Sequence, residues 1–339
     1  MAVCRPPTPL SDTPVDESKK RWTRHLITGL KLAVFALLCW AIYHALSSGS
    51  QQLSQHKWHV EPWWLVVSGL LYLAGMLPPA LFWHRILVQT DQPAGVMESV
   101  RAYYISQLGK YVPGKWMVIL LRRVLLRDPK VEHTVVAASV FFETFTFLAV
   151  GAAISAVMLL VWHTSHTLLI AEAVGAVILL GAPTIPFVFE FLLRKLGVTR
   201  LNPTAGKKFR KIRWSSLVMG WASIAVGWLL QGASLWATLR GLGATDSGPF
   251  QDLSLNTAAV ALSIVAGFLS QIPGGLAVRE WVSAQLIQPM YGESMAIVSA
   301  IIYRLVLVVS ELSVSIILYV AGWRRMPRVS EVAEAAEAT

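Results

Sequence analysis

Long apolar stretches separated by short polar segments dominate the chain, and their lengths predict membrane-spanning helices. A span needs about 20 mostly apolar residues. The stretches that meet this requirement are residues 26–46, 63–84, 134–162, 166–190, 214–239, 254–272 and 296–322. Two shorter segments, 104–125 and 276–291, contain or follow a proline–glycine break. The pattern therefore predicts an all-α polytopic membrane protein with seven or eight transmembrane helices and one or two re-entrant segments.

Composition supports a membrane protein with no soluble domain of useful size. Of the 339 residues, 55% are hydrophobic and only 14% are charged, whereas soluble domains carry about 25% charged residues. The formal net charge is +10, but the basic residues lie in loops beside the predicted spans. This placement favours cytoplasmic retention of those loops and attraction to anionic headgroups, and no nucleic-acid partner is expected.

Charge distribution predicts the organisation and orientation of the chain. Residues 1–25 form a proline-containing basic tail expected to be disordered, residues 26–323 the helical membrane domain and residues 324–339 a polar C-terminal tail. The predicted loop at 191–213 carries eight Lys and Arg residues and no acid. We expect it to be cytoplasmic, which places the N-terminus inside if 104–125 enters and leaves on the cytoplasmic side. For 276–291, a full crossing and a hairpin both remain open.

The two breaks share a short sequence motif. Ser106-Gln107 leads into Pro113-Gly114-Lys115, and Ser270-Gln271 leads into Pro273-Gly274-Gly275. Irregular backbone survives at membrane depth only inside protein or beside a wet cavity, and paired interrupted segments indicate a transporter's binding site. A helix with an intramembrane acid follows each break, Glu143 after the first and Glu311 after the second. This suggests a weak internal duplication, with chance similarity as the alternative.

Each break has the chemistry of an anion site. At the second, proline ends a helix, and the N–H groups of a new helix beginning near Leu276 would face the gap. Arg279 adds a planar fork suited to phosphate or carboxylate. At the first, Lys110 and Lys115 supply point charges for phosphate oxygens. The alternatives are a plain interfacial loop in which Arg279 pairs with Glu280, and an amphipathic helix on the membrane surface.

Arg304 and Glu311 are charged residues in an otherwise apolar predicted helix. They are seven residues apart and therefore share one face. A central charge costs roughly 2.5–3.5 kcal/mol on insertion scales, so each needs a partner or water. Glu143 and Arg279 are the candidate partners across helices. A buried ion-pair network that only fixes helix packing is the alternative to a substrate path.

No catalytic motif, metal site or cofactor site is expected. The histidine pairs His56/His59 and His163/His166 have no further ligands at a zinc spacing. No phosphate-binding loop, dinucleotide fingerprint or nucleophile elbow is present in the sequence. An enzymatic role is therefore not the leading hypothesis.

Three phrases resemble the membrane region of lysylphosphatidylglycerol synthases and the stand-alone flippase-like family built from it. They run from Pro79 to Arg85, from Ser106 to Gly114 (with Arg122 and Glu143), and from Pro273 to Glu280 (with Arg304). The resemblance covers about residues 25–325. It implies a bacterial or archaeal plasma-membrane protein that moves lipids or lipid-linked sugars between leaflets. The synthases carry a following aminoacyltransferase domain, for which this chain has no room, so aminoacyl transfer is not expected.

The leading hypothesis is a lipid flippase that holds an anionic or phosphate-bearing headgroup. The predicted substrate-binding residues are Lys110, Pro113, Gly114, Lys115, Arg122, Glu143, Gly274, Gly275, Arg279, Glu280, Arg304 and Glu311. One alternative is an intramembrane transferase acting on a polyprenyl phosphate or a phospholipid. Another is a non-catalytic membrane subunit that recruits a cytoplasmic partner through the basic 194–213 loop. The bulky apolar residues that follow Lys115 leave the substrate contact of the first break open.

Overall fold

Helices are the only regular secondary structure in the part of the chain that the structure, a computed structural model, describes. That part comprises residues 60–111, 116–126, 128, 130–162, 167–244 and 249–323. The predicted N-terminal tail, the first predicted span at 26–46 and the C-terminal tail at 324–339 lie outside it.

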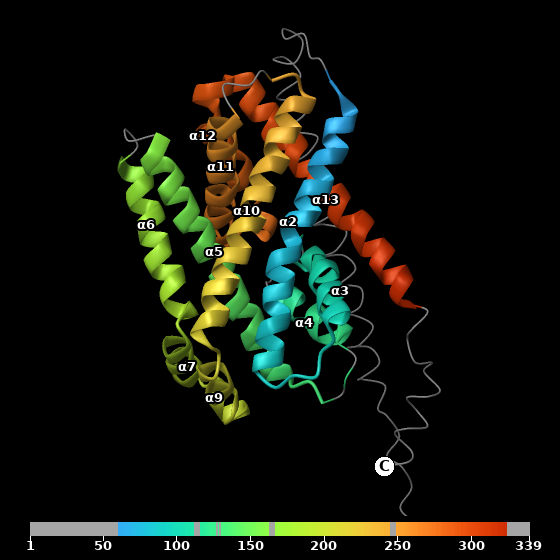
Figure 1. The fold of residues 1–339 in the computed structure, drawn as a ribbon, viewed down its shortest axis with the longest axis vertical. Helices are drawn as coiled ribbons and strands as arrows, with labels where there is room; N and C mark the ends of the chain where they lie inside the picture. Colours follow the sequence, from blue (N-terminus) through green and yellow to red (C-terminus); the bar gives the residue numbers. More distant parts are fainter. Residues whose placement is uncertain are drawn as a thin grey trace, which may run out of the picture. The chain divides into compact units, whose positions relative to one another are not determined.

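The described chain contains both long and short helices (Figure 1). The long helices are α2 (Pro62–Gln89), α5 (His133–Trp162), α6 (Thr167–Gly181), α10 (Trp214–Gly241), α11 (Pro249–Leu269) and α13 (Glu293–Trp323). The short helices are α3 (Val96–Ser106), α4 (Trp116–Leu125), α7 (Pro186–Lys195), α8 (Val198–Leu201), α9 (Ala205–Arg210) and α12 (Val278–Tyr291). Three single-turn 3-10 elements, η1 (Gln107–Tyr111), η2 (Ala182–Thr184) and η3 (Pro273–Gly275), complete the list.

Five of the long helices are long and apolar enough to cross a membrane. These are α2, α10 and most of α5, α11 and α13, and the bent pair of α6 and α7 makes up to six. Each coincides with a predicted span, and the remaining predicted span lies outside the described residues. The structure thus confirms an all-α polytopic membrane protein.

The predicted span at 166–190 is not one continuous helix. The chain bends by 80° between Val174–Thr184 and Pro186–Lys195. Pro183 and Pro186 flank the bend, and Ile185 between them is extended, with φ −75° and ψ 123°. A residue before proline is driven out of the helical region by the proline ring, which accounts for the bend. The residues that follow are helical as well, so the predicted loop at 191–213 contains the end of α7 and all of α8 and α9.

Glycines allow α2 and α10 to pack closely at the centre of the bundle. A Cβ on Gly75 would lie 2.9 Å from the carbonyl oxygen of Gly227, and a Cβ on Gly227 would lie 2.7 Å from that of Gly75. The hydroxyl of Ser68 bonds across the same interface to Ser234 and Thr238, both at 2.9 Å. Such contacts stabilise helix pairs in a membrane, where the hydrophobic effect does not drive helices to associate.

The two proline–glycine breaks each connect a pair of packed helices. The first pair is α3 and α4, and the second is α11 and α12. With a rise of about 1.5 Å per residue, α4 (10 residues) extends about 15 Å and α12 (14 residues) about 21 Å. Both are shorter than the hydrocarbon core of about 30 Å. Neither helix is long enough to cross the hydrocarbon core by itself.

Candidate functional site

The two breaks contact each other, although Ser106 and Ser270 begin them far apart in the sequence. Element η1 packs against η3. A Cβ on Gly274 would lie 3.3 Å from Cδ1 of Tyr111, so the tyrosine ring lies directly on the glycine turn. The turn itself requires positive φ at Gln271 (59°), Gly274 (63°), Gly275 (66°) and Ala277 (65°). Because two of these four are not glycine, the backbone of the second break stores strain, a feature that clusters at ligand sites.

Glu311 of α13 holds the first break. Its carboxylate is buried and accepts hydrogen bonds from the Lys110 ammonium and the Tyr72 hydroxyl. The Tyr111 hydroxyl donates a third bond at 3.0 Å. The sequence-based proposal of Arg279 as its partner is therefore wrong. Lys110 is the partner because the 3-10 turn of η1 directs this side chain toward α13, which also packs on η1.

Arg304 of the same helix holds the second break. Its Nη2 donates a 2.7 Å hydrogen bond to the carbonyl of Gly274, and its Nε lies 3.5 Å from Oε1 of Glu280. Its guanidinium carbon also lies 5.5 Å from the centroid of the Tyr111 ring. Glu143, the partner expected from the sequence, is not in contact with it. Helix α12 begins at Val278, and its first turn brings Glu280 to α13.

Glu143 instead belongs to a second buried network. Its Oε2 accepts a 2.9 Å bond from Arg122, and its Oε1 accepts a 3.2 Å bond from the Tyr103 hydroxyl. The Nε of Arg122 donates to Ser106 at 3.2 Å, and its guanidinium carbon lies 4.3 Å and 4.6 Å from the Tyr103 and Trp83 rings. This network joins α2, α3, α4 and α5 around one charge pair.

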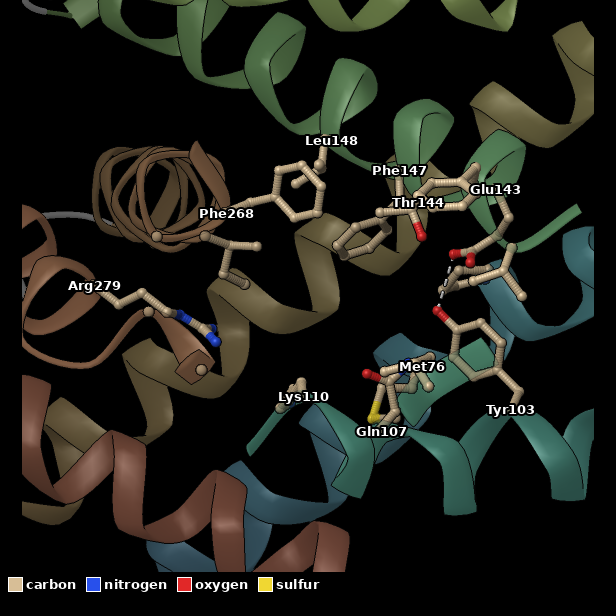
Figure 2. A pocket seen from close by; sticks show the side chains of 18 of the residues that line it. Met76, Tyr103, Gln107, Lys110, Glu143, Thr144, Phe147, Leu148, Phe268 and Arg279 are labelled. Carbon is tan, nitrogen blue, oxygen red and sulfur yellow. Dashed lines mark hydrogen bonds between the residues drawn. The ribbon is translucent and has the colours of Figure 1, made fainter. Parts of the chain in front are cut away.

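A cavity of about 310 Å³ lies between the two networks. Figure 2 shows Tyr103 and Glu143 on one side of it and Arg279 on the other, with Phe147, Phe268 and Met76 between them. Its polar lining residues are Tyr72, Tyr103, Gln107, Lys110, Arg122, Glu143, Thr144, Gln231, Gln271 and Arg279. Tyr72, Glu143 and Gln231 lie well inside their long helices, so we place the cavity at the membrane interior.

Arg279 directs its guanidinium into this cavity (Figure 2). Its aliphatic stem packs on two glycines: a Cβ on Gly267 would lie 2.5 Å from its Cγ, and one on Gly275 would lie 2.8 Å from its Cδ. Any larger residue at either position would displace the stem. Over the ranges that the structure describes, the Arg279 side chain has no hydrogen bond or ion pair. The cavity therefore carries a cation whose charge the neighbouring side chains do not neutralise by direct contact.

The cavity reaches the outside of the bundle beside α5 and the second break. Phe141, Gln271 and Ile272 line the cavity and are exposed. Val118 and Ile119 of α4 line it as well. Apart from Gln271, these lining residues are apolar, so the mouth is compatible with lipid chains outside it.

The structure distributes the predicted site residues over three places. Lys110, Arg122, Glu143, Gly274, Gly275 and Arg279 line the cavity. Glu280, Arg304 and Glu311 do not line it. They contact the two breaks on the side away from the cavity, so Arg304 and Glu311 do not form the predicted polar path. Pro113, Gly114 and Lys115 lie outside the described residues, as do the histidine pairs. Within the described ranges, no group of histidine, cysteine and carboxylate residues could hold a metal ion.

Sequence reasoning missed the tyrosines that bind both buried carboxylates. Tyr72, Tyr103 and Tyr111 were not among the predicted site residues. A single tyrosine in an apolar helix has the pattern of an ordinary core residue, because its hydroxyl partner lies on another helix. No local signal distinguishes the two cases.

A known family model matches most of the chain, including the residues around the cavity. The family model described as "Lysylphosphatidylglycerol synthase TM region" matches residues 29–312, well over half of the sequence. The comparison with curated proteins gave no match.

Proposed function

We propose that this chain, which belongs to the family of the lysylphosphatidylglycerol synthase transmembrane region, moves an anionic lipid headgroup between membrane leaflets. The headgroup would belong to a phospholipid or a lipid-linked saccharide of a prokaryotic plasma membrane. Membership of the family and the helical spans establish a multi-pass membrane protein; transport is our inference from the cavity.

The guanidinium of Arg279 inside the cavity is the observation that carries the proposal. A charge at membrane depth is costly and marks a substrate path by default. The other buried charges have direct partners: Glu311 binds Lys110, Arg122 binds Glu143, and Arg304 binds Glu280 and a backbone carbonyl. Arg279 alone among these cations is left facing open space in the described structure. A planar guanidinium is suited to a phosphate or carboxylate, so we assign an anionic group to this space.

The cavity dimensions and lining favour a headgroup rather than a whole lipid. About 310 Å³ lies at the lower end of the range for small-ligand sites, roughly 300–1,000 Å³. The apolar side chains at the mouth, such as Phe141 and Ile272, match acyl chains. In this arrangement the headgroup enters the cavity, and the acyl chains stay in the surrounding lipid.

The experiment uses liposomes of phosphatidylcholine with a trace of acyl-labelled fluorescent phosphatidylglycerol. Purified protein is reconstituted, and a membrane-impermeant quencher reports how much label reaches the outer leaflet. We expect wild-type protein to expose most of the label and R279A to expose no more than empty liposomes. R279K should retain part of the activity because the charge remains while the planar fork is lost. R85A removes an exposed arginine from α2 and serves as the control.

Three outcomes would count against transport. Unchanged exchange in R279A contradicts the proposal directly. A modified lipid formed by the purified protein would indicate a transferase. An effect confined to variants of the basic 194–213 segment would indicate a subunit that recruits a cytoplasmic enzyme.

A further inference from the structure

Helices α7, α8 and α9 and the segment up to Arg213 form a group of short elements that we call the basic platform (residues 186–213); Figure 1 shows α7 and α9 at one end of the bundle. Aromatic packing fixes it to α5. The Phe189 ring lies 5.0 Å from that of Phe142 and 4.9 Å from that of Phe209, and all three are buried. The orientation of the platform relative to α5 is therefore set by its core.

The opposite face of α7 is apolar and exposed. Phe187 and Phe191 are each 61% exposed, and Leu196, just after the helix, is 75% exposed. Phe187 and Phe191 are four residues apart and lie on one face of α7. Helix α7 thus buries one aromatic face against the bundle and leaves a second apolar face uncovered, a feature that marks interaction surfaces.

The platform is also rich in exposed basic residues. Arg194, Lys195, Arg200, Lys207, Arg210, Lys211 and Arg213 are all exposed. Glu190 binds Arg194 and lies 3.7 Å from Arg210, and Asp91 lies 3.4 Å from Lys211.

Four of these cations are not neutralised by such contacts. The described residues provide no ion pair for the side chains of Lys195, Arg200, Lys207 and Arg213. The platform therefore combines an aromatic face with an excess of positive charge.

We infer that the basic platform binds the anionic surface of the membrane leaflet beside it. Helix α7 is bent by 80° from α6, so if α6 crosses the bilayer, α7 lies close to the membrane plane. In that position Phe187 and Phe191 lie at the boundary between headgroups and acyl chains, and Lys195, four residues after Phe191 on the same side of α7, contacts lipid phosphates. Aromatic residues on one face and Lys or Arg around it are the composition of interfacial helices. An acidic soluble protein would match the charges but would leave the phenyl rings in water.

This inference is independent of the transport proposal, because it rests on residues that do not line the cavity. Juxtamembrane cations attract anionic lipids strongly, by about fivefold in binding for each Lys or Arg near the surface. The attraction is screened by salt within a Debye length, about 8 Å at physiological ionic strength. Binding to the platform should therefore depend on both the anionic lipid content and the salt concentration.

A nitroxide label tests the position of the aromatic face. F191C is labelled in a C4S/C39S background and reconstituted in nanodiscs of phosphatidylcholine and phosphatidylglycerol. We expect collisions with oxygen, which concentrates in lipid, to exceed those with a water-soluble nickel chelate. The same label at K207C, on the polar side of the platform, should show the reverse. A label at position 191 that prefers the nickel chelate would place the face in water and overturn the inference in favour of a soluble partner.

Thermal stability tests the charge contribution. Detergent-solubilised protein is titrated with phosphatidylglycerol, and the rise in Tm is compared with that given by phosphatidylcholine. In K195Q/R200Q, the phosphatidylglycerol concentration that gives half of the effect should rise at least about fivefold. The control R85Q/K130Q also removes one arginine and one lysine from exposed positions and should respond as wild type. Equal responses from the two double variants would contradict the inference.

Discussion

Lys110 and Glu311 are 201 residues apart in the sequence and form an ion pair in the interior of the bundle. Glu311 is fully buried, whereas the Lys110 side chain is 23% exposed and also lines the cavity. One member of the pair thus faces the candidate site, and the other anchors it to α13. Arg304 on the same face of α13 holds the second break through Gly274. A single helix therefore fixes the relative positions of the two breaks.

Removal of Glu311 should destabilise the protein strongly. E311A leaves the Lys110 ammonium and two tyrosine hydroxyls without their acceptor, and breaking a buried pair from one side costs about 3–5 kcal/mol. We expect a large fall in the Tm of the detergent-solubilised protein. E293A removes the exposed carboxylate at the start of α13 and should leave Tm almost unchanged. The exchange K110E/E311K should recover part of the loss, and no recovery would show that the pair is not a separable unit.

Replacement of Arg122 by lysine should lower the stability of the protein. The guanidinium lies between the Tyr103 and Trp83 rings and also reaches Ser106 and Glu143. An ammonium forms no such planar stack, so R122K should lose the ring contacts, each worth about 0.5–2 kcal/mol, and one hydrogen bond. Thermal denaturation should show R122K below wild type. The control R85K is at an exposed position and should match wild type, whereas equal Tm values for R122K and wild type would argue against stacking.

Alanine at Gly274 should disturb the site more than alanine at another positive-φ glycine. Alanine at either Gly274 (φ 63°, ψ 3°) or Gly292 (φ 81°, ψ 161°) would take on backbone strain of roughly 1–3 kcal/mol. Only at Gly274 would the new Cβ lie 2.9 Å from Nη2 of Arg304, whereas nothing lies within 4 Å at Gly292. We expect G274A to lose lipid exchange in the liposome assay and G292A to retain it. Similar losses in both variants would indicate that backbone strain, and not the Arg304 contact, is responsible.

Stability should fall in acid through Glu132, just before α5. The hydrogen bond from Lys208 lowers the pKa of this carboxyl below its ordinary value, and Asn202 and Gln92 add to the effect. Because the folded-state pKa lies below that of the unfolded chain, about 4.3, the contribution to stability is complete above that value. It is lost as pH falls through the lower folded-state pKa.

The measurement for Glu132 is Tm as a function of pH. E132Q should have a lower Tm than wild type near neutral pH, and the difference between the two should shrink below about pH 4. E293Q removes an exposed carboxylate in the first turn of α13 and is the control. A difference that stays constant from pH 7 to acid would contradict a charge-dependent role for Glu132.

Sequence alone was sufficient wherever a property depends on one segment. The apolar lengths gave the positions of α2, α5, α10, α11 and α13, because a helix that satisfies its own backbone is the only stable form for such a segment in lipid. Pro273 and Gly274 likewise located the second break, since proline and glycine end helices through their own geometry. Pro183 and Pro186 also mark the bend at Ile185, but the continuous apolar stretch around them led to the prediction of one unbroken span.

Tertiary structure decided which charges meet. Arg304 and Glu311 could be assigned to one face of a helix from their spacing, but their partners come from segments far away in sequence. Glu280, Lys110 and Tyr72 become neighbours of α13 only when the two breaks pack together. Partner choice depends on distances of a few ångströms between helices, which periodicity within one helix does not contain. For the same reason the sequence named Arg279 as an anion ligand, but only packing on Gly267 and Gly275 directs it into the cavity.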